Sequence, residues 1–554
     1  MPTGGNSGKL SEFAIFLMNS MKTRDFLILS FILSFTTSIS VMASSPFLLA
    51  SGDVSTYASL GREIVANGFL IPATNAIHYP GSAWVYPPVV PYIFAVTVLF
   101  SESGQEMYLS FAILGAFLFS ITSIPVYFVS RNFFSEKPAR FTSLFYSFFS
   151  PSLYAMTWGG YPQLLGFFLM GWLLYLSLRA QDGDASILRI TVLGGITLSV
   201  LILSHDLSGV MMLAILIIMF LINVARSIVF GGTDAKRRNI TFSLGSVLIA
   251  LIPSIAWYLP RLWWVIDSAA PTTSPVFLEY AGNAHHSQTV LSAIKADLLS
   301  ISQAINGISI NLAILIITLV LVPIAILYLW KGRGSSEKHR IMLTFICLPL
   351  AIMIVEFYDS VLFTRVAYFA AFFVFPVVSY LVFATVSRDL SGHAERKPGQ
   401  TMTVLKYLPS IIIIVLVINS AFALEFDMNS HSYYSQSSIG NHDAVEVAQF
   451  FLNNATAHGK TVVAAGDIGF FIAGYAGNPV LTYENYNLLT QPVEWEESHA
   501  AYVMIYQSSV IHSNVTTYIA KYGVSYVVIP TSVTSYFSGY RLVFHNGEYN
   551  IFTT

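Results

Sequence analysis

Long apolar runs alternate with short polar loops over the first 424 residues of the chain. A helix needs roughly 20 apolar residues to cross a bilayer, so these runs predict transmembrane helices. We predict about eleven of them, at 26–43, 108–130, 141–157, 161–178, 190–204, 207–225, 241–259, 309–330, 341–355, 361–386 and 407–424. The run at 87–100 is also apolar, but it is short and contains prolines, which indicates a re-entrant or interfacial segment.

The basic residues of the loops predict how the chain is oriented, because cytoplasmic loops carry an excess of Lys and Arg. With the N-terminus in the cytoplasm, the cytoplasmic loops hold most of the 27 basic residues, and the external exceptions are Arg62, Arg261, Lys295, Arg365, Lys460, Lys521 and Arg541. The first run has a long apolar core for a secretory signal, so we expect it to remain as an anchor. We therefore predict a multi-pass protein of the cell membrane with a first external loop at 44–107.

The pattern changes after residue 424, where about 130 residues of mixed polarity follow. Their periodicity predicts helices at 444–457, 468–475 and 514–521, strands at 460–466, 478–484 and 524–530, and a hairpin at 541–552 that turns at Asn546-Gly547. Strands that alternate with helices indicate a small α/β domain. The fold class is thus an α-helical multi-span module at 1–424 with an extracytoplasmic α/β domain at 425–554.

Composition agrees with a membrane protein and excludes some partners and cofactors. Hydrophobic residues make up 55% of the chain and charged residues 10%, against roughly 25% charged in soluble domains. The net charge of −2 gives no sign of a nucleic-acid partner, so membrane lipids are the expected surroundings. The one cysteine, Cys347, lies inside an apolar run, which excludes a disulfide in the external parts and a cysteine metal site.

The first external loop contains a carboxylate close to the predicted membrane surface. It reads SGDVSTYASLGREIVANG and then HYPGSAWVYPPVVPY, so Asp53 follows the first span and Tyr86 precedes the next apolar run. An acid at this place suits chemistry on a substrate whose tail stays in lipid, and Tyr86 is a candidate substrate contact. Asp53 also suits the cap of a helix that starts at Val54, and the two roles are compatible. We expect Arg62 and Glu63 to lie on the solvated side of that helix.

Two other groups of ionisable residues interrupt apolar sequence at predicted outer edges. His205-Asp206, in SHDLSG, either forms the turn between two spans, with Asp206 as a helix cap, or holds a metal ion or a substrate phosphate. EFYDSVLFTR contains Glu356, Asp359 and Arg365. An arginine there either pairs locally with Asp359 or offsets charge on a leaving phosphate.

These residues together resemble a known family. A first span, an external acid within GDVSTYASLGREIVANG, a PP pair and a second span are similar to the N-terminal module of the GT-C glycosyltransferases. AVEVAQFFLNNATAHGKTVVAAGDIGFFIAGYAGNPVL resembles the helix, strand and Asp-x-Gly turn that open the outer domain of archaeal oligosaccharyltransferase-like members. The resemblance implies a membrane enzyme of the cell envelope that transfers a sugar from a polyprenyl-phosphate-linked donor to a glycan, lipid or protein acceptor.

The resemblance also implies roles for single residues. Asp53 is expected to act as the general base or to bind a metal at the reaction centre. His205 and Asp206 are expected to help hold a divalent cation, Mg²⁺ or Mn²⁺, or the donor phosphate. Ala464-Ala465-Gly466-Asp467-Ile468-Gly469 keeps the acid and glycine of the oligosaccharyltransferase motif but lacks its two tryptophans. Transfer of a monosaccharide or another lipid-linked glycosyl group is therefore favoured over protein N-glycosylation.

Two other function classes are compatible with the same sequence. A transporter or flippase also needs many spans, although such proteins usually place polar groups near the bilayer midplane. A catalytically degenerate relative could act as a scaffold in envelope assembly. The segment YAMTWGGYPQLLG lacks the second acidic motif that the family carries near its third span, which keeps this alternative open.

Overall fold

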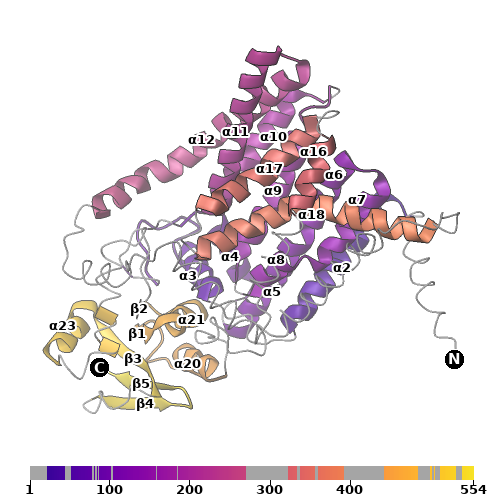
Figure 1. Ribbon diagram of the computed structural model, residues 1–554. Coiled ribbons are helices and arrows are strands. Elements are labelled where there is room, and N and C mark those ends of the chain that lie inside the picture. Colours follow the sequence, from indigo (N-terminus) through magenta and orange to yellow (C-terminus); the bar gives the residue numbers. More distant parts are fainter. Residues whose placement is uncertain are drawn as a thin grey trace, which may run out of the picture.

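A computed structural model of the protein describes residues 21–43, 52–77, 80, 84, 86–101, 104–157, 159–183, 185–269, 322–332, 337–355, 360–391, 442–483, 500–501, 504–505, 512–531 and 540–554. Figure 1 shows most of the helices gathered in one bundle, with a small sheet and its helices beside one end of it. The predicted span at 407–424 lies outside the described residues.

The bundle is formed by the N-terminal two thirds of the chain (Figure 1). Its elements are α2 (Thr23–Ala43), α3 (Gly52–Ala66), α4 (Val89–Phe100), α5 (Gly104–Ile121), α6 (Ser123–Phe133), α7 (Glu136–Phe145), the 3₁₀ turn η2 (Tyr146–Phe148), α8 (Ser150–Thr157), α9 (Tyr161–Arg179), α10 (Ile187–Ile202), α11 (Asp206–Phe230), α12 (Asp234–Ala269), α16 (Val322–Gly332), α17 (Glu337–Val355) and α18 (Ser360–Ser391).

Four segments among the described residues are long and apolar enough to cross a membrane. They are Glu106–Phe133, Tyr161–Arg179, Asp206–Phe230 and Asp234–Arg261. Three shorter apolar helices, Val89–Phe100, Ile187–Ile202 and Tyr368–Leu381, accompany them. The protein is thus a mostly helical membrane protein, and the total of about eleven spans stays a prediction.

The predicted run at 141–157 differs from a continuous helix. The structure divides it into α7, η2 and α8, with Phe149 in an extended conformation between the last two. Pro151 follows directly in the first turn of α8, a position where proline is tolerated because its missing N–H costs no helical hydrogen bond. Hydropathy alone does not reveal this break, because residues 141–157 themselves contain no charged residue.

The bundle core is held in large part by aromatic packing. The ring of Phe167 in α9 stacks on Phe372 in α18 with centroids 5.1 Å apart, and Phe149 meets Phe375 of α18 at 5.0 Å. Small residues allow close helix crossings elsewhere, as at Gly61, where a Cβ would lie 2.9 Å from the backbone nitrogen of Ala95 in α4. Close approach at small residues is a common way for helices to associate in membranes.

The C-terminal α/β region, which we define as the described residues from 442 to 554, confirms the predicted helices and strands. It contains α20 (His442–Asn453), β1 (Thr461–Ala465), α21 (Gly466–Ala476), β2 (Val480–Tyr483), α23 (His512–Tyr522), β3 (Val524–Pro530), β4 (Arg541–His545) and β5 (Tyr549–Thr553). The sheet order is β2-β1-β3-β5-β4. β1 pairs in parallel with β2 and β3, and β5 pairs antiparallel with β3 and β4.

Alternating side chains of this sheet cover its two faces, as the strand period of two requires. One face, with Val462, Ala464 and Val528, belongs to the same apolar core as α20, α21 and the bundle. The other face, with Val463 and Val527, packs against α23. Because both faces are covered, the sheet lies between α23 on one side and α20 and α21 on the other (Figure 1).

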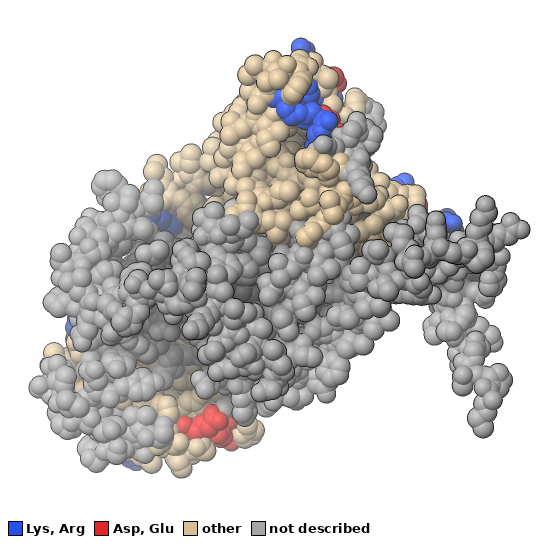
Figure 2. Space-filling model, viewed as in Figure 1, with Lys and Arg blue, Asp and Glu red and all other residues tan. Residues whose placement is uncertain are grey.

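Charged side chains at one end of the bundle tie the helix ends together. Figure 2 shows Lys and Arg gathered over the α11–α12 corner, at the end opposite the C-terminal α/β region. Arg238 of α12 donates to the carbonyl groups of Ala180, Asp182 and Ala185 at 2.8, 2.7 and 2.5 Å. Lys338 of α17 forms an ion pair with Asp182 at 3.1 Å.

A two-point ion pair joins α11 to α17 at the same end. Arg226 Nη1 and Nη2 donate to the two carboxylate oxygens of Glu337 at 2.9 and 2.8 Å. The hydrogen bonds from Arg226 hold the pKa of Glu337 below its ordinary value. A carboxylate with a lowered pKa stabilises the fold above its unfolded pKa, and this stabilisation is lost as the pH falls through the lowered pKa.

We predict that Glu337→Gln lowers the free energy of unfolding by about 1–3 kcal/mol at neutral pH, because two charge-assisted hydrogen bonds are weakened. The difference between variant and wild type should shrink as the pH falls below the pKa of Glu337. Thermal unfolding of detergent-solubilised protein at neutral and acidic pH measures both values. Glu106→Gln, at an exposed glutamate of α5, is the matched control. Equal stability of Glu337→Gln and wild type at neutral pH contradicts this role.

Candidate active site

Asp53 lies in the first turn of α3, so the predicted helix begins at Gly52 rather than after the acid. An acidic side chain in the first turn is stabilised by the positive end of the helix dipole. The side chain is partly exposed, whereas the residues from Val54 to Gly61 are buried. The carboxylate is therefore held at the end of a helix that is otherwise packed inside the protein.

Tyr57 lies between Asp53 and Tyr86. Residues four apart lie on the same helix face, which places Tyr57 beside Asp53 on α3. The Tyr57 ring meets that of Tyr86 edge to face, with centroids 5.8 Å apart. Tyr86 is 36% exposed, so a tyrosine of the predicted site remains accessible at this face.

Trp84 and Val89, just before and at the start of α4, contact α12 and the end of α10. The indole N–H of Trp84 donates to the carbonyl oxygen of Tyr86 at 3.1 Å. The backbone N–H of Val89 donates to the carbonyl oxygen of Leu203 at the end of α10, at 3.0 Å. Tyr86 is therefore fixed between α3 and the corner where α10 gives way to α11.

His205 caps α11 at this corner. Its Nδ1 accepts from the backbone N–H of Ser208 at 3.4 Å and lies 2.6 Å from the Ser208 hydroxyl oxygen. The imidazole ring also approaches Phe369 of α18, with centroids 6.4 Å apart. The helix cap is thus His205, and Asp206 is the first helical residue, which corrects the expectation that Asp206 is the cap.

Asp206 and α12 form the other side of the corner. The hydroxyl of Tyr258 donates to the Asp206 carboxylate, and it lies 3.2 Å from the carbonyl oxygen of Ile202. One turn further along α12, the guanidinium of Arg261 lies 3.3 Å from the ring centroid of Trp257. Its Nε donates to the carbonyl oxygen of Trp84 at 3.0 Å, and its Nη1 donates to that of Trp257 at 2.7 Å.

Sequence reasoning did not select Tyr258 or Arg261 as site residues. The signal for them is the WYLPR stretch at the outer end of an apolar run, where aromatic residues surround a single arginine. Aromatic residues are common at membrane interfaces, so this pattern is weak without a partner. Their partners, Asp206 and the Trp84 carbonyl, become visible only once the helices are packed.

Arg62 and Glu63 do not lie on a solvated side of α3, and that expectation is wrong. Glu63 is only 3% exposed, and its Oε1 accepts from the backbone N–H of Ile77 at 2.6 Å. Arg62 donates from Nε to the carbonyl oxygen of Gly474 at 3.1 Å and from Nη2 to that of Tyr475 at 3.2 Å. Burial lowers the pKa of the Arg62 guanidinium from its ordinary value.

The structure describes only part of the predicted site. Asp53, Tyr86, His205 and Asp206 are described, and the Trp84–Val89 segment connects the first of them to the last two. Glu356 and Asp359 lie outside the described residues, as does the side chain of Arg365 in α18. The roles assigned to all seven residues therefore stay predictions.

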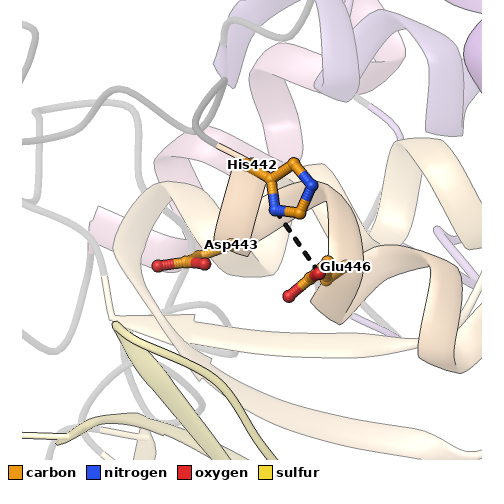
Figure 3. Close-up of side chains that lie close together, drawn as sticks. All are labelled: His442, Asp443 and Glu446. Atoms are coloured by element: carbon orange, nitrogen blue, oxygen red, sulfur yellow. Dashed lines mark ion pairs between the residues drawn. The ribbon is translucent and has the colours of Figure 1, made fainter.

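A second group of possible metal ligands lies in the C-terminal α/β region. His442, Asp443 and Glu446, at the start of α20, offer ligand atoms within 4.8 Å of one another. Figure 3 shows the imidazole turned towards Glu446, with an ion pair whose Nδ1 to Oε1 distance is 3.4 Å. His442 is largely exposed, and Asn546 donates to Glu446 Oε2 at 3.2 Å. The cluster can therefore be explained by the contact between α20 and the β4–β5 turn.

Comparison with known proteins identifies the fold. Residues 85–257 match the family of dolichyl-phosphate-mannose-protein mannosyltransferases. The structure is similar to the archaeal oligosaccharyltransferase AglB from Archaeoglobus fulgidus, in complex with an inhibitory peptide and a dolichol-phosphate. The TM-score is 0.55 and the sequence identity is 14%, over 91% of this chain and 69% of that chain. The chain has the GT-C glycosyltransferase fold.

Two further GT-C structures are similar over most of this chain. ArnT from Cupriavidus metallidurans bound to undecaprenyl phosphate gives a TM-score of 0.54 and 11% identity over 95% of this chain and 97% of that chain. The arabinofuranosyltransferase AftD from Mycobacteria gives 0.52 and 11% over 96% and 42%. None of the curated proteins matches the sequence. The mannosyltransferase match includes Tyr86, His205 and Asp206, and it begins after Asp53.

We predict that Arg261→Lys destabilises the Trp84–Val89 segment almost as much as Arg261→Ala. Lysine keeps the charge but lacks the planar fork that stacks on Trp257 and donates to two carbonyl groups at once. Amide hydrogen exchange at Trp84, Tyr86 and Val89 should become faster in both variants. Arg541→Ala, at an exposed arginine of β4, is the control. Wild-type exchange in Arg261→Lys contradicts the proposed geometry.

Proposed function

We propose that this protein is an integral membrane glycosyltransferase that moves a sugar from a polyprenyl-phosphate-linked donor to an acceptor on the extracytoplasmic face. The observation that carries the proposal is the mannosyltransferase match over residues 85–257 within a chain that has the GT-C fold. Two of the similar structures contain dolichol-phosphate or undecaprenyl phosphate, which supports a polyprenyl phosphate as the lipid part of the donor.

The distribution of charge supports the proposed orientation. Arg226, Lys236, Arg238 and Lys338 meet at the end of the bundle that lies away from the C-terminal α/β region. Cytoplasmic loops are rich in Lys and Arg, so we assign this end to the cytoplasm. Asp53, Tyr86 and the His205-Asp206 corner would then lie at the extracytoplasmic face, beside the C-terminal α/β region.

Asp53 is the proposed general base. Its carboxylate would accept the proton of an acceptor hydroxyl as that oxygen attacks the anomeric carbon of the donor sugar. The new glycosidic bond forms while the bond from the anomeric carbon to the phosphate oxygen breaks, and the polyprenyl phosphate leaves with the bonding electrons. General-base help of this kind typically contributes about 10²–10⁴-fold to a rate.

The leaving phosphate needs positive charge or hydrogen-bond donors, because negative charge develops on it in the transition state. Arg261 is a candidate to supply this positive charge. Its guanidinium stacks on Trp257 of the same helix, α12, and donates to the carbonyl oxygen of Trp84. Arg365 stays a second candidate, as do Glu356 and Asp359 for contacts to the donor or acceptor. Tyr86 offers a partly exposed ring and hydroxyl at the same face.

A divalent cation such as Mg²⁺ or Mn²⁺ fits the ligand types at the site. Carboxylates and an imidazole suit first-row and hard divalent ions, and Asp53, His205 and Asp206 supply these groups. A further Archaeoglobus fulgidus oligosaccharyltransferase structure is a complex with Zn and sulfate, which supports a divalent metal in this protein. A bound cation would neutralise charge on the donor phosphate.

The acceptor is proposed to be a glycan, a lipid or a protein. We do not expect it to be a protein sequon that a tryptophan motif recognises. Ala465 and Gly466 precede Asp467 where oligosaccharyltransferases carry two tryptophans, as judged from the resemblance of the surrounding sequence. This supports transfer of a monosaccharide or another lipid-linked glycosyl group.

We predict that Asp53→Asn lowers the release of polyprenyl phosphate from a radiolabelled polyprenyl-phosphate hexose by at least about 10²-fold, because the amide cannot accept the proton. The assay uses purified full-length protein and measures free lipid phosphate. Glu106→Gln, at an exposed acid of the neighbouring helix α5, should keep wild-type activity. Full activity in Asp53→Asn excludes Asp53 as the base, and sugar-lipid flux across sealed vesicles without glycosyl transfer would instead support a flippase.

We also predict that chelation of divalent cations reduces this release and that Mg²⁺ or Mn²⁺ restores it. Loss of a ligand or of its orienting partner usually weakens metal affinity by about 10–100-fold. His205→Ala and Asp206→Asn should therefore shift the metal concentration for half-maximal activity upwards by that factor. Glu446→Gln, in the distant cluster on α20, should leave it unchanged. Wild-type activity in the presence of a strong chelator contradicts a metal requirement.

A further inference from the structure

The helix that carries Asp53 is attached directly to the C-terminal α/β region. Arg62, nine residues after Asp53 on α3, donates to the carbonyl oxygens of Gly474 and Tyr475 at 3.1 and 3.2 Å. Both carbonyls belong to the last turn of α21, where the helix leaves them without partners inside the helix. A cation at this end of a helix is also favoured by the helix dipole.

The same two helices approach closely beside Asp53 itself. A Cβ on Gly474 would lie 2.6 Å from the carbonyl oxygen of Ser55 and 2.8 Å from its Cα. The side chain of Ser55 lies 2.7 Å from the hydroxyl of Tyr108 in α5. Only glycine fits at position 474 without moving one of these groups, so α21 fixes the first turn of α3 from one side.

A second connection runs from Glu63 to the sheet. The buried Glu63 carboxylate accepts from the backbone N–H of Ile77, and the carbonyl oxygen of Ile77 accepts from the N–H of Val480 at 2.9 Å. Val480 begins β2, the edge strand of the sheet. Arg62 therefore contacts α21 directly, and the adjacent Glu63 is linked to β2 through Ile77.

On its other side α3 is packed against the bundle. A Cβ on Gly61 would lie 2.9 Å from the nitrogen of Ala95 and 3.1 Å from the Cβ of Phe94, so α4 is in close contact along this face. The helix is therefore held between α4 and α21. A helix in this situation has little freedom to shift along its axis or to turn its first residue away.

We propose that Arg62 and Gly474 are positioning residues through which the C-terminal α/β region holds the Asp53 carboxylate in place for the transfer reaction. The inference rests on the proposed function, in which Asp53 accepts the proton of the acceptor hydroxyl. It adds a task for the C-terminal α/β region, which would act on the reaction through α3 rather than by supplying a reacting group. Misplacement of a reacting group by about 1 Å can cost about 10²-fold in rate.

Gly474→Ala is the sharpest test. Alanine is the better helix former, so a loss of function cannot come from weaker helix propensity in α21. The added methyl would push α21 away from Ser55 and release the first turn of α3. Gly183→Ala is the matched control, because a Cβ there meets nothing within 4 Å.

The expected result separates catalysis from binding. At saturating polyprenyl-phosphate hexose, Gly474→Ala and Arg62→Gln should lower the maximal rate of lipid-phosphate release by about 10-fold or more, with the dissociation constant of polyprenyl phosphate changed by less than about threefold. Arg62→Lys keeps the charge but not the two-carbonyl fork, so it should rescue part of the rate. Amide hydrogen exchange at residues 53–57 should become faster in all three variants.

Each other outcome counts against the inference. A wild-type rate in Gly474→Ala overturns it, and so does a rate loss that is matched by loss of polyprenyl phosphate binding and of thermal stability, since that pattern marks a general structural role. If the wild-type protein shows no transfer at all, the proposed function fails on its own. Hydrogen exchange at 53–57 then decides the inference separately, and exchange unchanged by Gly474→Ala and Arg62→Gln overturns it.

Discussion

The close packing of α3 between α4 and α21 is the constraint on which the rest of the site depends. Two glycines make it possible, because Gly61 and Gly474 let neighbouring backbones approach to distances that no side chain would allow. The α/β region thereby shares one continuous apolar core with the helical bundle. The first turn of α3, with Asp53, is placed by both parts of the chain together.

Polar contacts at the edge of the bundle make a second connection, which joins Trp84 to α12 and the start of α4 to the end of α10. Arg261 contacts Trp257 on its own helix and the carbonyl of Trp84, and Val89 bonds to the carbonyl of Leu203. Such groups are costly to remove from water unless they are paired, so their pairing fixes the geometry of this edge. Structures with the same fold contain dolichol-phosphate or undecaprenyl phosphate, which supports the proposal that this edge binds a polyprenyl-phosphate donor.

Several elements were predictable because local pattern decides them. The strands β1 and β3 bury apolar side chains on both faces, so each appears in the sequence as a short continuous apolar run. Asp53 and His205 could be selected because ionisable residues beside apolar runs are rare and conspicuous. Arg62 and Glu63 were misplaced because a charged pair on a short helix normally faces water, and their partners lie more than 400 residues away at Gly474 and 14 residues away at Ile77.

The sequence by itself determined the membrane class, the α/β character of the C-terminal α/β region, and which acids and histidines stand out, because these depend on composition and on short-range periodicity. Only the tertiary structure decided that α21 holds α3, that His205 rather than Asp206 caps α11, and that Tyr258 and Arg261 belong to the same edge. Those features depend on distances between segments far apart along the chain. Such distances are set by side-chain volume and hydrogen-bond partners across packed helices, which no local pattern encodes.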